Sequence, residues 1–162
     1  MSKKYAISIL FFVCLLGMSA GVYSMIRTLP VAELVSKSDY IVIGEVRKIE
    51  VDTTQRPKSA GMRYLRNEII VTESLKGDWP IDRLMFFRTI TAEHWIEDNV
   101  EFPYPGTQVL LFVRKGESGG LSLVNGIQGL WPLQEGKPLR MGTGKTVEEI
   151  KSLIRSQAGR KE

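Results

Sequence analysis

The chain has a single cysteine, Cys14, and a single histidine, His94, among its 162 residues. Cys14 lies in an apolar N-terminal run, so the rest of the chain has neither a disulfide nor a cysteine-based metal site. Serine–histidine hydrolysis or a histidine-rich metal site would have to use His94 alone. The GxSxG, HExxH and paired CxxC motifs are also absent. We therefore predict no metal and no cofactor.

A strong excess of one charge is also lacking. The chain has 22 basic and 18 acidic residues, and removing the terminal Lys3 and Lys4 leaves 20 against 18. This balance is too even to indicate nucleic-acid binding. We interpret the cations spread over two expected strands as an ordinary solvated surface; they are Arg63, Arg66, Lys76, Arg83 and Arg88.

A complete phosphate-binding loop is missing as well, although MGTGKTVEEI at residues 141 to 150 resembles the end of one. Such a loop needs a glycine five positions before Gly144, and that position is Leu139. Thr146 and Glu149 instead have the T-x-x-E spacing of a capping box. The stretch therefore predicts a helix beginning near Val147 and no bound nucleotide.

Charge is absent from residues 5 to 26, which follow the basic pair Lys3 and Lys4. A short basic region and an apolar run are typical of a secretory signal. The same run of about 22 residues is long enough to cross a bilayer of about 30 Å. It is therefore either a cleaved signal peptide or a membrane anchor, and both place residues after about 27 outside the cytoplasm. The Phe-Phe-Val sequence before Cys14 does not favour lipidation of that cysteine.

The remaining pattern predicts a mainly β domain over residues 27 to 145 and a helix with a charged tail over 146 to 162. A short helix is expected at residues 30 to 37. Strands are expected near 39–51, 63–75, 83–90, 107–115, 121–126 and 128–133, with an aromatic surface loop over 93–106. Gly44 lies inside the first strand and predicts a bulge. Together these features favour a small, partly open β-barrel of five to six strands.

Four segments carry a resemblance to known proteins: AELVSKSDYIVIGEVRKIE, VTESLKG, PGTQVLLFV and GIQGLWPL. They resemble a group of small exported bacterial proteins. Their pattern of apolar residues and glycines also resembles the OB-fold domains of the netrin and metalloproteinase-inhibitor superfamily. The resemblance covers about residues 30 to 133 and implies an OB-like barrel acting as a binding module. The animal inhibitors depend on an N-terminal cysteine and on disulfides, which this domain lacks, so protease inhibition is not carried over.

Aromatic residues between charged ones are the candidate ligand-binding residues, because OB-folds bind ligands on such surfaces. The candidates are Trp79, His94, Trp95, Tyr104 and Trp131. We expect a non-enzymatic binding or assembly module in the periplasm or at the cell surface. Its expected partners are an envelope protein or a glycan, and the membrane if residues 5 to 26 are retained. Two alternatives stay open: a hydrolase using His94 with loop carboxylates, and an inhibitor of an envelope protease.

Overall fold

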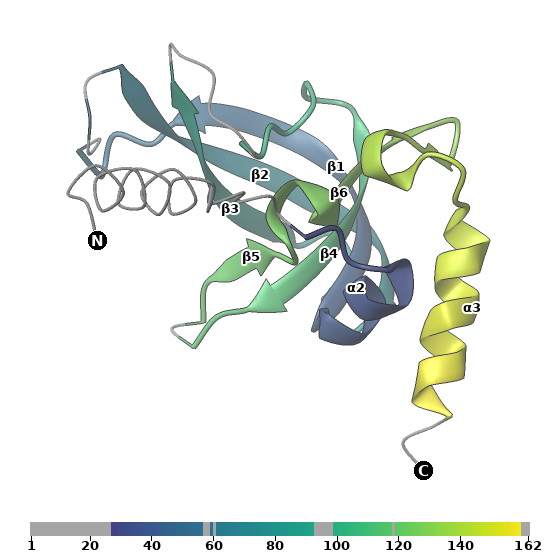
Figure 1. Ribbon diagram of the computed structural model, residues 1–162. Coiled ribbons are helices and arrows are strands. Elements are labelled where there is room, and N and C mark those ends of the chain that lie inside the picture. Colours follow the sequence, from purple (N-terminus) through teal and green to yellow (C-terminus); the bar gives the residue numbers. More distant parts are fainter. Residues whose placement is uncertain (1–26, 57–58, 60, 93–98, 118, 160–162) are drawn as a thin grey trace, which may run out of the picture.

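The computed structural model describes residues 27–56, 59, 61–92, 99–117 and 119–159 (Figure 1). Residues 1–26, where the sequence predicts an export segment, and most of the loop around His94 lie outside these ranges. No helix in the described ranges is long and apolar enough to cross a membrane. The helices are α2 (Val31–Lys37), η1 (Gly126–Gly129), η2 (Arg140–Gly142) and α3 (Val147–Ala158). The strands are β1 (Tyr40–Val51), β2 (Met62–Lys76), β3 (Leu84–Ala92), β4 (Gln108–Lys115), β5 (Leu121–Leu123), β6 (Leu130–Gln134) and β7 (Lys137–Pro138).

The strands form one antiparallel sheet of seven strands in the order β3-β2-β1-β4-β6-β7, with β5 pairing β4 beside this path. The mainly β prediction is confirmed. The expected count of five to six strands was too low, because β7 has only two residues and was not expected as a strand. The sheet is curved, but it is not closed into a barrel: β3 and β5 lie close together without a ladder between them. The stretch expected as a strand from residue 128 begins as a 3-10 turn, and β6 starts at Leu130.

The predicted bulge at Gly44 is confirmed. The register between β1 and β2 shifts between Ile43 and Gly44. A Cβ at this position would lie 2.7 Å from the backbone oxygen of Ile70, so only glycine lets the two strands approach so closely. The bulge increases the local bend of β1, which helps β2 and β3 to curl over the core.

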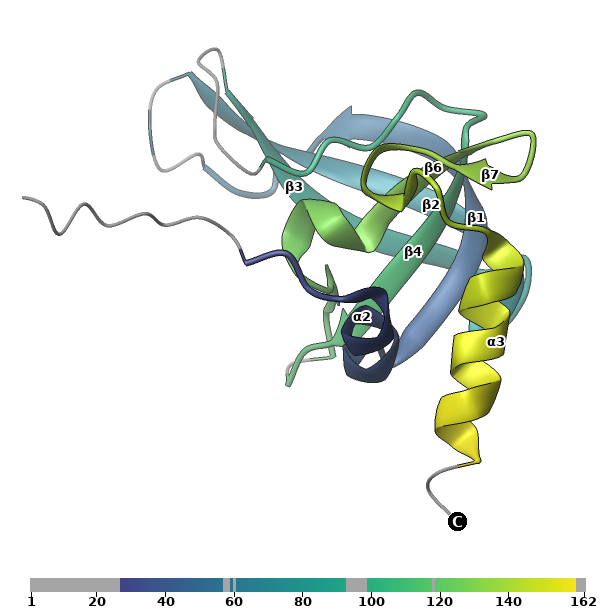
Figure 2. The same cartoon turned by 45° about the vertical axis from the view of Figure 1, so that its right-hand side comes forward.

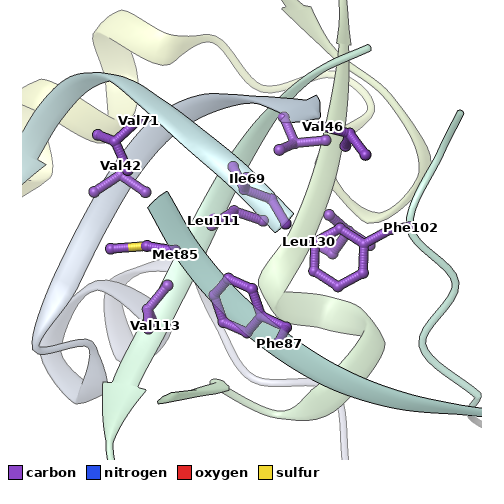
Figure 3. Close-up of a cluster of buried hydrophobic side chains, with 11 residues drawn as sticks. Val42, Val46, Ile69, Val71, Met85, Phe87, Phe102, Leu111, Val113 and Leu130 are labelled. Carbon is purple, nitrogen blue, oxygen red and sulfur yellow. The ribbon is translucent and has the colours of Figure 1, made fainter. Parts of the chain in front are cut away.

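The first half of β1 and the middle of β4 are buried on both faces, which explains the apolar runs in these parts of the two strands. Val42 and Leu111 face one cluster of buried side chains, which fills the concave side of the sheet (Figure 3). Ile41 and Phe112 face a second cluster, which also contains residues of α2 and α3. Figure 2 shows the two helices together on that side of the sheet. The sheet therefore has two cores, and its face under the helices is closed by them.

The capping box predicted at the start of α3 is confirmed. Thr146 Oγ1 accepts a hydrogen bond from the Glu149 N–H at 3.1 Å, and Glu149 Oε2 accepts one from the Thr146 N–H at 2.9 Å. Gly144 lies just before it with a φ of 79°, which is the turn expected there. The stretch that resembled a phosphate loop is thus a helix start whose first donors are already used.

Thr146→Ala is expected to lower the free energy of unfolding by about 1 kcal/mol, because the backbone N–H of Glu149 loses the hydroxyl oxygen that accepts its hydrogen bond. Urea denaturation followed by circular dichroism measures the change. Thr143→Ala is the matched control, since Thr143 is exposed and its side chain makes no described hydrogen bond. Equal stability of the two variants would show that the capping box contributes nothing.

Candidate functional site

A cleft of about 320 Å³ opens on the concave side of the sheet, beside the first core cluster. Its floor comes from β1, β2 and β3, and its opposite wall comes from residues 100–104 and from η2. The lining residues are Ile49, Leu65, Asn67, Ile90, Thr91, Val100, Glu101, Phe102, Pro103, Tyr104 and Arg140. Most of these side chains are apolar, so the few polar groups determine what the cleft can recognise.

The wall formed by residues 100–104 is fixed to the domain. Phe102 is buried in the first cluster and packs against Phe87, with ring centroids 5.5 Å apart. After the wall, the N–H of Gly106 donates to the Val46 carbonyl at 2.8 Å, and the N–H of Val46 donates to the Thr107 carbonyl at 3.0 Å. Core packing and backbone hydrogen bonds therefore fix the position of the wall relative to the floor.

Asn67 is the only asparagine or glutamine lining the cleft, and it is 1% exposed. Its Nδ2 donates to the Phe87 carbonyl at 3.1 Å and to Thr89 Oγ1 at 2.9 Å. Its Oδ1 is buried and accepts no hydrogen bond from any described residue. Rotating the amide would place two acceptor oxygens, Oδ1 and the Phe87 carbonyl, against each other, so the orientation is fixed. A buried acceptor without a donor costs about 1–3 kcal/mol.

Arg140 occupies the rim of the cleft. Its backbone has a φ of 53°, an uncommon conformation for a residue other than glycine. Its Nη1 donates to the Glu101 carbonyl at 3.0 Å, which joins η2 to residues 100–104 within the same wall. Within the described residues the guanidinium forms no ion pair, so its other N–H groups remain available at the rim.

The structure places the predicted ligand-binding residues that it describes in different parts of the molecule. Tyr104 is 87% exposed and lines the cleft. Trp79 is half-buried away from it, edge-on to Tyr40 with ring centroids 5.4 Å apart. His94 and Trp95 lie outside the described residues.

Trp131 requires a correction. It is completely buried, its ring lies 4.8 Å from Phe112, and its Nε1 donates to the Gln128 carbonyl at 2.8 Å. A ligand cannot reach this side chain on the folded surface. Its place in the core follows from its size and from the single polar atom that a nearby carbonyl satisfies.

The sequence-based selection missed Asn67 and Arg140. Asn67 lies two positions from both Leu65 and Ile69 on β2, so the three side chains share one face of the strand. A polar residue on this apolar face is a signal that the sequence contains. Arg140 carried no such signal, because its place at the rim depends on how the chain turns after β7.

Three of the five cations on the predicted solvated surface have acidic or carbonyl partners in the structure. Arg66 lies 3.2 Å from Glu68 and stacks 4.4 Å from the centre of the Phe86 ring. Arg88 pairs with Asp52 at 2.8 Å. Lys76 is used differently, because its Nζ donates at 2.6 Å to the carbonyls of Val35 and Ser38 near the end of α2.

Acidic groups near these cations are likewise paired. Hydrogen bonds from Thr54, first its side chain and then its backbone N–H, lower the pKa of Asp52, and Arg88 adds to the effect. Across the described ranges, no three or more histidine, cysteine or acidic side chains gather in a way that could hold a metal ion.

Comparison with known proteins adds no functional assignment to this geometry. No model of a known protein family matches the chain, and no curated protein sequence matches it significantly.

Proposed function

We propose that the protein is a non-enzymatic binding module of the cell envelope, exported or anchored by residues 5 to 26, which takes its ligand in the cleft between β2, β3 and the 100–104 wall. The observation that carries the proposal is the cleft itself, about 320 Å³ in volume and lined mostly by apolar side chains, with Arg140 and Tyr104 exposed at its rim. An apolar cleft with a few fixed polar groups is the usual form of a ligand site.

The strand neighbours support an OB-like architecture for this module. β1 pairs with both β2 and β4, β2 pairs with β3, and β5 follows β4 and lies near β3. We interpret the sheet as an OB-like barrel that is open between β3 and β5, where no ladder joins the two strands. OB-folds bind ligands over their second and third strands, and four cleft residues lie on those strands here.

The start of the described domain supports a location at the membrane surface. Leu29 is hydrogen-bonded through both its N–H and its carbonyl to the side chain of Gln128. The carbonyl of Arg27 accepts from Asn125 Nδ2 at 2.9 Å. The domain is thus fixed from the first residue after the apolar run, so a retained anchor would hold it close to the bilayer.

A cleft-filling variant tests the proposal. Val100→Trp is expected to abolish co-purification of the natural ligand, because the larger side chain occupies the cleft. The protein is recovered from membrane and soluble fractions, and native mass spectrometry compares the bound species. The same spectra give the N-terminus, and a species starting between residues 21 and 25 would identify a cleaved signal.

Leu84→Trp is the matched control, because Leu84 is 38% exposed and does not line the cleft. If Val100→Trp and the wild type carry the same bound species, the cleft is not the ligand site. Recovery of a protease that depends on the open cleft would favour the inhibitor alternative.

A further inference from the structure

Exposed apolar side chains gather beside the mouth of the cleft. Tyr104 is 87% exposed, and Leu139 and Met141, on either side of Arg140, are 38% and 43% exposed. Tyr104 and Arg140 both line the cleft, so the two segments that carry them meet there. The hydrogen bond from Arg140 to the Glu101 carbonyl joins these segments. We call Tyr104, Leu139 and Met141 the rim patch.

Cations lie on the same two segments as the rim patch. Lys137, Arg140 and Lys145 are all exposed. Glu101 and Glu135 are also exposed there, so three cations against two carboxylates leave a net charge of +1. This charge is too small to bind an acidic partner by itself, and the apolar side chains must contribute most. Tyrosine, aliphatic side chains and long cations together are typical of a surface that lies at a membrane interface.

The start of the described chain is joined to the wall that carries Tyr104. The carbonyl of Arg27 accepts a hydrogen bond from Asn125 at 2.9 Å. The next residue, Gly126, begins η1 and lies against the wall, because a Cβ on it would be 3.9 Å from Val100 Cγ2. Figure 2 shows η1, in green, beside the dark start of the described chain. The first residue after the apolar run is therefore held beside this wall.

A second set of contacts joins the start of the domain to η2. The side chain of Gln128 is bonded to the backbone of Leu29, and its carbonyl accepts from Trp131 Nε1. The ring of Trp131 lies directly under Gly142 of η2. Because Trp131 is completely buried, this connection is part of the packed core. The fold thus fixes residue 27 relative to both segments of the rim patch.

Resting on the proposed anchoring by residues 5 to 26, we infer that the rim patch docks on the surface of a phospholipid bilayer. The side chains of the patch enter the headgroup layer, and Lys137 and Lys145 contact acidic headgroups. The chain that would hold the domain at the bilayer ends at residue 26, beside the segments that carry the patch. Because Tyr104 and Arg140 also line the cleft, docking places the mouth of the cleft at the membrane.

Fluorescent labels at two positions test this orientation. Met141→Cys puts a label in the rim patch, and Ser156→Cys puts one at an exposed position near the end of α3. Both chains also carry Cys14→Ser, so each has a single thiol. The full chain is reconstituted into vesicles of phosphatidylethanolamine and phosphatidylglycerol. We expect aqueous iodide to quench the label at position 141 about tenfold less than the label at 156, and spin-labelled lipid to quench it more.

Leu139→Asp is expected to remove this difference, because a carboxylate loses its hydration when it enters the interface. Val51→Asp is the matched control, since Val51 is 48% exposed and belongs to neither segment of the patch. If Leu139→Asp does not fold, the two labels in the otherwise unchanged chain still decide the matter. Equal quenching by iodide at both labels would overturn the docking and leave the cleft function, which Val100→Trp tests separately, intact.

The same vesicles test a chain recovered without residues 5 to 26. This chain is expected to sediment with the vesicles, and Leu139→Asp is expected to prevent it. Failure of the unchanged mature chain to sediment would overturn the docking. A label at position 141 that is protected from iodide but not quenched by spin-labelled lipid, with protection that rises with protein density, would identify a second copy on the patch. That result would also overturn the bilayer as its partner.

Discussion

Trp131→Ala is expected to lower the free energy of unfolding by about 3–5 kcal/mol, the usual cost of removing a large aromatic side chain from a core. Trp131 is 0% exposed and lies against Phe112 in the second core cluster. The substitution also leaves the Gln128 carbonyl without the indole donor that it accepts from at 2.8 Å. Urea denaturation, followed by the circular dichroism of the sheet, measures the loss.

The surroundings of Trp131 leave little room for relaxation. A Cβ on Gly142 would already lie 2.6 Å from the indole ring, so η2 is built closely over it. Removing the ring leaves a cavity that η2 and β6 cannot fill without moving. Because η2 also contributes Arg140 to the cleft, any movement of η2 in this variant is expected to change the cleft as well.

Tyr104→Ala is the control for this prediction, because Tyr104 is 87% exposed. Its effect on the free energy of unfolding is expected to stay within about 0.5 kcal/mol. A stability loss at Tyr104 comparable with that at Trp131 would contradict the placement of the two side chains.

These two aromatics also show what the sequence predicts and what it does not. Residue type alone grouped Trp131 with Tyr104, although one side chain fills the core and the other is exposed. The difference arises from distant contacts, since Trp131 is covered by η2, whose turn after β7 leaves no periodic signal. Local patterns were more informative. The T-x-x-E spacing located the start of α3 correctly, because a capping box needs only residues within one turn.

The same reasoning applies to the sheet and the cleft. The apolar run of β4 predicted a strand, and Gly44 predicted a bulge, because each depends on one strand and its neighbour. Closure of a barrel requires hydrogen bonds between β3 and β5. The three-residue strand β5 pairs with β4 and forms no ladder with β3. The cleft joins residues of β1, β2, β3 and η2, so only the assembled fold brings them together.

Gln128→Ala is the second substitution with a large expected effect, a loss of about 2–4 kcal/mol in the free energy of unfolding. Gln128 is 5% exposed, and its amide forms a reciprocal pair with the backbone of Leu29, with distances of 2.9 Å and 2.6 Å. Alanine leaves the N–H and the carbonyl of Leu29 without partners, and each such partly buried group costs about 1–3 kcal/mol.

The substitution is also expected to release the start of the domain. Asn125 Nδ2 donates both to Gln128 Oε1 at 2.7 Å and to the Arg27 carbonyl, so it loses one of its two acceptors. Limited trypsin digestion followed by mass spectrometry should then detect faster cleavage after Arg27, because a protease cleaves backbone that has left its hydrogen bonds.

Gln134→Ala is the matched control, since Gln134 is exposed and its side chain makes no hydrogen bond within the described residues. It is expected to leave both stability and the rate of cleavage after Arg27 unchanged. Equal cleavage rates in Gln128→Ala and the wild type would mean that Gln128 does not hold residues 27 to 29. The domain would then be joined to the apolar run by a free tether, and a retained anchor would no longer set its orientation at the membrane.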